Sequence, residues 1–199
     1  MLKRILRELK LHAPFTGFGA LTGIVILAMI VYLHVSREAS VTIFWIFHPF
    51  HVVLSAIVTT GMYRLHSRGR LWAAILIGYS GSVGIATLSD CIIPYVGEFL
   101  LDLPHRGIHL GFIEKWWLVN PLAGLGILIG YLRPSTKFPH AGHVLLSTWA
   151  SLFHMVMALG ESFSLVMMGV ILIFLFLGVW VPCCTSDIVF PLLFVGKEP

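Results

Sequence analysis

Long apolar runs separated by short polar stretches dominate the pattern of this chain. A helix needs about 20 mostly apolar residues to cross a hydrocarbon core of roughly 30 Å. Several runs reach that length and are too long for strands. We therefore predict an all-α, polytopic transmembrane bundle of about six spans. The spans run from Phe15 to Val35, Val41 to Tyr63, Leu71 to Val96, Trp116 to Leu132, His143 to Leu159 and Ser162 to Val181. The fourth and fifth are short, so a bundle of five spans is the main alternative.

The remaining stretches are short, so residues 1–199 are expected to form a single integral membrane domain. Residues 1–14 carry Lys3, Arg4, Arg7 and Lys10 between leucines and isoleucine, which predicts an amphipathic helix at an anionic membrane surface. Residues 97–115 form an outer loop, and residues 182–199 form a C-terminal cytoplasmic segment.

Composition supports the membrane interpretation. The chain is 58% hydrophobic and 11% charged, with a mean hydropathy of +0.93, which is far above that of a soluble domain. Most Lys and Arg residues fall on the side of the N-terminus, so both termini are predicted to be cytoplasmic. No basic stripe with interleaved aromatic residues is present, so nucleic acid is not an expected partner.

Glycines at four-residue spacing predict two places where helices approach closely. Gly19 and Gly23 lie in the first span, and Gly126 and Gly130 lie in the fourth. Packing of the bundle explains both pairs.

Ten histidines in so apolar a chain need an explanation. An ionisable side chain inside a bilayer costs about 2 to 3 kcal/mol or more unless it is paired, hydrated or bound to metal. His48 and His51 share one face of the second span and flank Pro49. At ~1.5 Å per residue they lie about 10 to 15 Å below the outer surface. Asp90 and His154 fall at a similar depth in other spans.

The outer loop adds His105 and His109, which share a face if that stretch is helical. Imidazoles suit zinc, copper or iron, and a carboxylate suits the harder of these ions. We therefore predict a transition-metal site near the outer face. Its candidate ligands are His48, His51, Asp90, His105, His109 and His154. Asp90 or Glu114 is the candidate catalytic group for proton transfer.

Two other interpretations of the polar residues remain open. The histidines can be separate interhelical hydrogen-bonding residues, and the stripes that include Ser55 and Ser147 can be ordinary helix contacts. A second, inner group is also conceivable, with a spacing that matches no known zinc finger or ribbon. Its members are His140, His143, Cys183, Cys184 and Asp187.

The His-Pro-Phe-His stretch at 48–51, with the His105/His109 and His140/His143 pairs, resembles the histidine boxes of membrane di-iron hydroxylases and desaturases. Histidines and an aspartate on separate helices are also similar to membrane zinc hydrolases of the ceramidase and adiponectin-receptor type. The chain lacks an adjacent His-His pair, and its spans are fewer than in those hydrolases.

Three functions follow from this pattern. The first is a metal-dependent membrane enzyme, an oxidoreductase or hydrolase, acting on a lipid or small apolar substrate. The second is a transition-metal transporter or channel. The third is a heme b electron-transfer protein or a structural subunit of a membrane complex. The expected partners are membrane lipids, and either further copies of the chain or other subunits.

Overall fold

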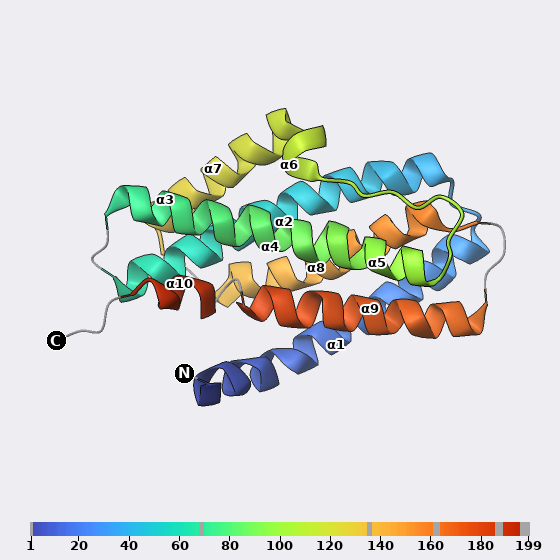
Figure 1. The fold of residues 1–199 in the computed structure, drawn as a ribbon, viewed down its shortest axis with the longest axis horizontal. Coiled ribbons are helices and arrows are strands. Elements are labelled where there is room, and N and C mark those ends of the chain that lie inside the picture. The colour runs from blue at the N-terminus through green and yellow to red at the C-terminus, as the bar shows by residue number, and fades with distance from the viewer. Residues whose placement is uncertain (1, 68–69, 135–136, 161–163, 186–188, 196–199) are drawn as a thin grey trace.

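The structure is a computed structural model that describes residues 2–67, 70–134, 137–160, 164–185 and 189–195 (Figure 1). In these ranges the chain is helical and has no strands, so the predicted all-α class is confirmed. The main helices are α1 (Leu2–Tyr32), α2 (Arg37–His66), α7 (Trp116–Leu132), α8 (Lys137–Ala158) and α9 (Leu165–Cys184). Two short helices complete them, α6 (Gly111–Glu114) and α10 (Phe190–Leu193).

One further long helix, Leu71 to Leu100, changes its winding twice. It consists of α3 (Leu71–Tyr79), the π-helical turn η1 (Ser80–Gly84), α4 (Ile85–Thr87), the π-helical turn η2 (Leu88–Ile92) and α5 (Ile93–Leu100). Pro94 follows η2 and has no N–H group to donate to the carbonyl of Asp90 four residues earlier. The N–H of Ile93 instead bonds to the carbonyl of Leu88, five residues back. Such π turns often occur at functional sites.

Among the residues that the structure describes, five helices are long and apolar enough to cross a membrane. They are His12–Tyr32, Arg37–His66, Leu71–Leu100, Ala141–Ala158 and Leu165–Cys183. The fourth predicted span is present as α7, which is apolar but only 17 residues long. The count of six spans therefore stays a prediction. The start of the sixth predicted span, Ser162, lies outside the described residues.

The N-terminal segment is continuous with the first long helix. The backbone of α1 stays helical from Leu2 through Pro14 to Tyr32. The side chains of Lys3, Arg4 and Arg7 lie outside the described part of the chain, and Lys10 is exposed. The position of residues 1–14 at a membrane surface stays a prediction. The start of α1 and α10 lie toward the same end of the bundle (Figure 1).

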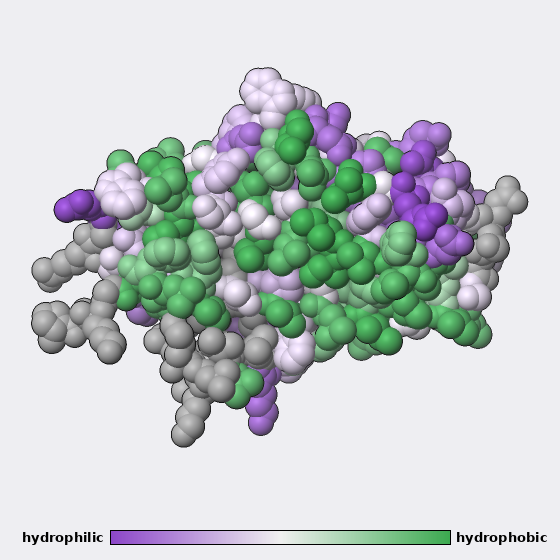
Figure 2. Space-filling view, in the orientation of Figure 1, coloured by the Kyte–Doolittle hydropathy of each residue, from purple (hydrophilic) through white to green (hydrophobic). Residues whose placement is uncertain are grey.

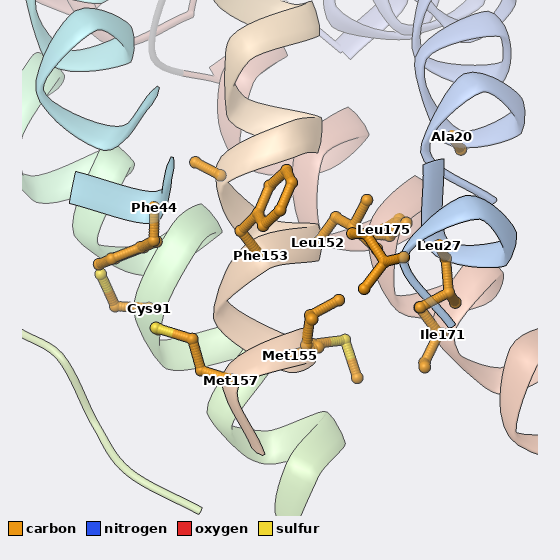
Figure 3. Close-up of a cluster of buried hydrophobic side chains, with 13 residues drawn as sticks. Ala20, Leu27, Phe44, Cys91, Leu152, Phe153, Met155, Met157, Ile171 and Leu175 are labelled. Atoms are coloured by element: carbon orange, nitrogen blue, oxygen red, sulfur yellow. The ribbon is translucent and has the colours of Figure 1, made fainter. Parts of the chain in front are cut away.

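The core lies where α2 packs on α7 and α8, and where α1 packs on α8 and α9. Phe44, Leu27 and Leu175 are fully buried in its largest apolar cluster (Figure 3). Ser36 caps α2 by accepting a hydrogen bond from the N–H of Ala39, so α2 begins four residues before the predicted Val41.

Large apolar side chains also cover much of the outer surface. Leu165 is 80% exposed and Val166 is 77% exposed, and green apolar side chains cover most of the visible face (Figure 2). Soluble monomers rarely expose a continuous apolar surface of this extent. The surface is compatible with an integral membrane protein.

Candidate metal centre

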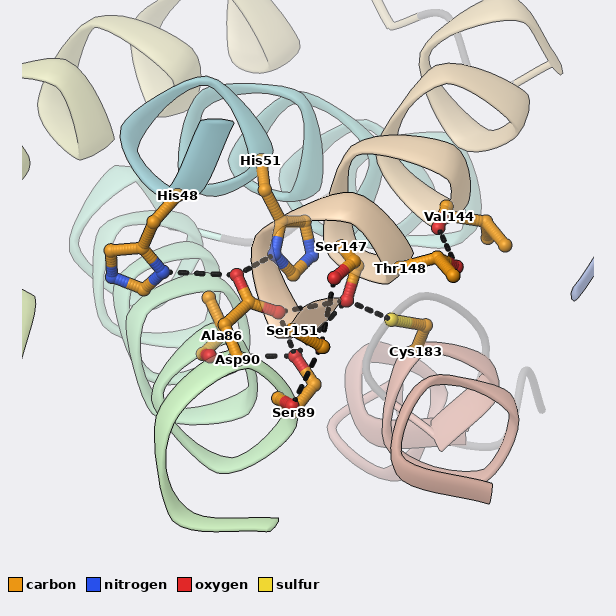
Figure 4. A network of polar contacts seen from close by, with 10 residues as sticks. All are labelled: His48, His51, Ala86, Ser89, Asp90, Val144, Ser147, Thr148, Ser151 and Cys183. Atoms are coloured by element: carbon orange, nitrogen blue, oxygen red, sulfur yellow. Dashed lines mark hydrogen bonds and ion pairs between the residues drawn. The ribbon is translucent and has the colours of Figure 1, made fainter. Parts of the chain in front are cut away.

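Asp90 is the hub of a buried polar network in the middle of the bundle (Figure 4). Its Oδ2 atom accepts hydrogen bonds from Nδ1 of His48 at 2.9 Å and from Nδ1 of His51 at 2.7 Å. Its Oδ1 atom accepts from the hydroxyls of Ser89 at 2.7 Å and Ser147 at 2.8 Å. All five side chains are buried to at least 99%. The carboxylate thus joins α2, η2 and α8.

These hydrogen bonds determine the tautomer of each neutral imidazole, with Nδ1 directed to the carboxylate and Nε2 directed away from it. An ionised Asp90 offers only acceptor oxygens, so both histidines donate Nδ1–H to it. In a neutral ring, Nε2 then carries the free lone pair. Nε2 of His51 is buried and has no hydrogen-bond partner among the described residues. It is therefore available as a metal ligand.

His51 meets two more ligand-grade side chains from other helices. One ligand atom each from His51, His143 and Cys183 lies within 4.8 Å of the others, and all three residues are buried. The rings of His51 and His143 are stacked, with their centroids 5.4 Å apart and their planes at 20°. The thiol of Cys183 donates to the hydroxyl of Ser147 at 3.5 Å. We call these three residues the His51/His143/Cys183 centre.

The chemistry of this set suits a transition metal. Two imidazoles and a thiol are ligands for zinc or a cuprous ion, whereas calcium and magnesium require oxygen ligands. Metal-binding histidines usually donate their second ring N–H to a carboxylate or a carbonyl, which sets the tautomer and orients the ring. The His51–Asp90 hydrogen bond has this form. A metal ion could therefore be held here, with Asp90 as the group that positions His51.

A second pair of histidines, called the outer pair after the predicted topology, lies near the end of α8 and in the loop at residues 101–110. Nδ1 of His154 bonds to Oε1 of Glu98 at 2.6 Å, and both side chains are buried. Nδ1 of His109 bonds to Oε2 of Glu114 at 3.2 Å, and both side chains are partly exposed. The rings of His109 and His154 are 5.4 Å apart between centroids. These two histidines repeat the imidazole–carboxylate pairing seen at Asp90.

The structure therefore separates the six predicted ligands into three groups. His48, His51 and Asp90 are hydrogen-bonded together. His109 and His154 form the outer pair with Glu98 and Glu114. His105 is exposed, and its backbone N–H bonds to the carbonyl of Ala158.

The loop around His105 and His109 differs from the helical expectation. Residues 101–110 are not helical, so the four-residue spacing does not place these two side chains on one helix face. A Cβ atom at Gly111 would lie 2.5 Å from Nε2 of His48, so a residue without a side chain lets the end of this loop cover His48. The end of the loop thus packs directly against His48.

Glu114, the second candidate catalytic group, lies at this outer loop. Its carboxylate accepts from His109 and from the backbone N–H of Leu110 at 3.0 Å, and it is 41% exposed. Both of these bonds are within the loop and α6, at the His109 end of the bundle. Asp90 is therefore the only predicted catalytic group that contacts a ligand of this centre.

Cys183 and His143 were part of the weaker inner group in the sequence prediction. The structure brings them to His51, while the side chains of His140, Cys184 and Asp187 lie outside its described part. Spacing along the chain could not join them to His51, because the pairing depends on α8 packing against both α2 and α9. One feature of the sequence did point to them. His143 and Cys183 both lie near an end of a predicted span, and both residue types are common ligands of transition metals.

The serine stripes are used mainly as contacts between helices. The hydroxyl of Ser151 bonds to the carbonyl of Ser89 at 3.0 Å and to that of Ser147 at 2.8 Å. The bond to Ser89 links α8 to η2 next to Asp90, whereas the bond to Ser147 lies within α8.

No protein-family model matches this sequence, and no curated protein or solved structure is significantly similar to it. The site is therefore interpreted from its own geometry.

Proposed function

We propose that this chain is a multi-pass integral membrane protein that holds one transition-metal ion at the His51/His143/Cys183 centre. The observation that carries the proposal is the convergence of three ligand atoms within 4.8 Å, from α2, α8 and α9, at a buried point. Independent packing residues have no reason to converge in this way. The Nδ1 hydrogen bond from His51 to Asp90 supports the same conclusion.

Zinc or a cuprous ion is the metal that fits best, because the ligand set combines imidazole with thiolate. Iron has less support, since no carboxylate belongs to the set. Heme b also has less support: the ring of Phe44 packs 5.4 Å from the rings of both His48 and His154, where a macrocycle would have to fit.

The leading role for the ion is that of a catalytic centre in a membrane enzyme. Catalytic zinc sites have three protein ligands and keep a fourth position open for water, which becomes more acidic when bound. The His51/His143/Cys183 centre supplies three ligands. Apolar helices surround it, so a lipid or small apolar molecule is the proposed substrate. Asp90 is proposed as the positioning residue for His51.

Transport of the metal ion is the second candidate function, because the histidines form a row along the bundle. His109 and His154 lie toward one end, His48 and His51 lie near the middle of α2, and His143 lies nearer the other end of α8. On α8 alone, His143 and His154 are separated by roughly 16 Å at ~1.5 Å per residue. This row would offer successive ligands to a moving ion.

Metal content of the purified protein tests the proposed centre. We expect the wild type, purified in detergent with zinc and then dialysed, to retain one ion per chain. Cys183→Ser and His143→Ala should lose it. Cys91→Ser is the matched control, because Cys91 is also buried but lies outside the centre. Cobalt substitution should give a sulfur-to-metal absorption band in the wild type and the control, and none in Cys183→Ser. Full metal content in both centre variants would refute the proposal.

Flux measurements separate the two roles. Wild-type protein in liposomes with an internal zinc indicator should show no zinc uptake above that of empty liposomes if the ion is a resident catalytic cofactor. Uptake that Cys183→Ser abolishes and Cys91→Ser retains would favour the transporter.

A further inference from the structure

The outer pair, His109 and His154, is not part of the proposed centre, yet it has the features of a ligand site. Each imidazole bonds through Nδ1 to a carboxylate, Glu114 or Glu98. The centroids of the two rings are 5.4 Å apart, and their planes meet at 66°. The second oxygen of Glu98 accepts from the backbone N–H of Gly107 at 3.2 Å, which ties the outer loop to this pair.

His154 provides an independent observation that points to a ligand. Its side chain is fully buried, and its Nε2 atom has no hydrogen-bond partner in the described ranges. A buried polar nitrogen without a partner costs about 1 to 3 kcal/mol. With Nδ1 bonded to Glu98, Nε2 holds the lone pair of the neutral ring, which is the ligand atom for a transition-metal ion.

Exposure falls steadily from the surface inward along this pair. Glu114 is 41% exposed and His109 is 30% exposed, whereas His154 and Glu98 are buried. A hydrated cation would therefore meet two partly exposed ligand groups first and the buried pair next. The carboxylates add negative charge along the same path, which attracts cations.

An apolar ring separates this outer pair from the network of Asp90. Phe44 is fully buried, and its ring centroid lies 5.4 Å from His154, 6.2 Å from His109 and 5.4 Å from His48. Across the described part of the chain, no hydrogen bond connects His109 or His154 with His48 or Asp90. Phe44 contacts the histidines on both sides of this break.

We propose that His109 and His154 form an entry site for the transition-metal ion, and that Phe44 is the barrier between this site and the His51/His143/Cys183 centre. The inference rests on the proposed function, since it supplies the route by which that centre is loaded. Beyond Phe44, the carboxylate of Asp90 and the imidazole of His48 would receive the ion before it reaches His51. The outer pair selects ions that accept nitrogen ligands.

Rates of metal exchange test the barrier separately from metal content. We expect Phe44→Ala to release zinc to an external chelator faster than the wild type by on the order of tenfold or more, because an apolar constriction slows the passage of a cation. Phe44→Leu keeps a large apolar side chain, so it should increase the rate of zinc release by a smaller factor. This variant also tests the barrier if Phe44→Ala fails to fold. Zinc content at equilibrium should stay at the wild-type level. Phe50→Ala is the control, since Phe50 lies on the same helix and is 59% exposed.

Loading kinetics test the entry site. We expect the metal-free double variant His109→Ala/His154→Ala to bind zinc several-fold more slowly than the metal-free wild type when zinc is limiting. Its zinc content at saturation should equal that of the wild type. His66→Ala is the control, because His66 is an exposed histidine at the other end of α2. If the Phe44 variants release zinc, and the double variant binds zinc, at wild-type rates, the entry route is refuted. The proposed His51/His143/Cys183 centre would not be affected by that result. A wild type that binds no zinc would instead reject the proposed function, and the entry route with it.

Discussion

At Asp90, a fully buried carboxylate accepts hydrogen bonds from four side chains. These bonds offset the cost of burying the group but leave the charge to be balanced. If both His48 and His51 are neutral, the network carries one negative charge. A cation at the neighbouring His51/His143/Cys183 centre would balance it, which couples the protonation of the network to metal binding.

Removing the carboxylate charge should therefore weaken metal binding without removing a ligand. We expect Asp90→Asn to raise the dissociation constant for zinc by about 10- to 100-fold, as for other groups that orient metal-binding histidines. Competition with a chelator of known affinity measures this constant. Glu38→Gln, at an exposed carboxylate at the start of α2, the helix that carries His51, should leave it unchanged. An unaltered constant in Asp90→Asn would show that Asp90 does not position His51.

At the scale of the helices, each predicted span coincides with an observed helix. An apolar run of that length is too long for a strand, so a helix is the expected structure. The ends were less accurate. Since Ser36 caps α2, the helix starts at Arg37. This places His51 about 21 Å from the start of the helix rather than about 15 Å, at ~1.5 Å per residue. His51 thus lies deeper than predicted; its ring stacks on His143, whereas His154 packs on His109.

The predicted grouping of the site was therefore partly achievable from sequence. The three-residue spacing correctly placed His48 and His51 on one face of α2. The similar depth estimated for Asp90 below the membrane surface correctly placed it near them. The role of Cys183 could not be inferred, because periodicity does not say which helices are neighbours. Nor does it reveal the π turn η2, in which Asp90 lies.

The glycine spacing predicted a close helix contact at Gly126 and Gly130, and the structure confirms one there and gives α2 as the partner of α7. A Cβ atom at Gly126 would lie 2.6 Å from the carbonyl oxygen of Val53, and one at Gly130 would lie 2.6 Å from that of Ile57. Both neighbours are backbone atoms, which cannot move aside as a flexible side chain could. The contact therefore depends on the absence of side chains at these positions.

Replacing one of these glycines should destabilise the bundle. We expect Gly126→Ala to lower the free energy of unfolding by about 1 to 3 kcal/mol, the usual cost of overpacking. Unfolding in detergent by denaturant, followed by circular dichroism, measures the change. Gly124→Ala is the matched control on the same helix, because a Cβ atom there meets nothing within 4 Å. Equal stability of the two variants would contradict the close contact.

For the whole molecule, polarity and exposure are arranged opposite to those of a soluble protein. The interior holds His48, His51, His143, His154 and Asp90, while much of the outer surface is apolar. Lipid would satisfy that surface, and the interior polar groups are satisfied by one another or by a bound ion. Elsewhere on the described surface, the more polar side chains gather around the outer loop at one end of the molecule (Figure 2).

The shortness of α7 has a consequence for the surrounding bilayer in the six-span arrangement. Its 17 residues extend about 25 Å, less than the roughly 30 Å of a typical hydrocarbon core. Lipids beside α7 would have to compress, whereas those beside the 30-residue α2 would not. We expect thermal stability in liposomes to be higher with shorter acyl chains than with longer ones, measured at equal headgroup composition. A protein with a short hydrophobic helix on one side would then accumulate in the thinner membranes of a cell.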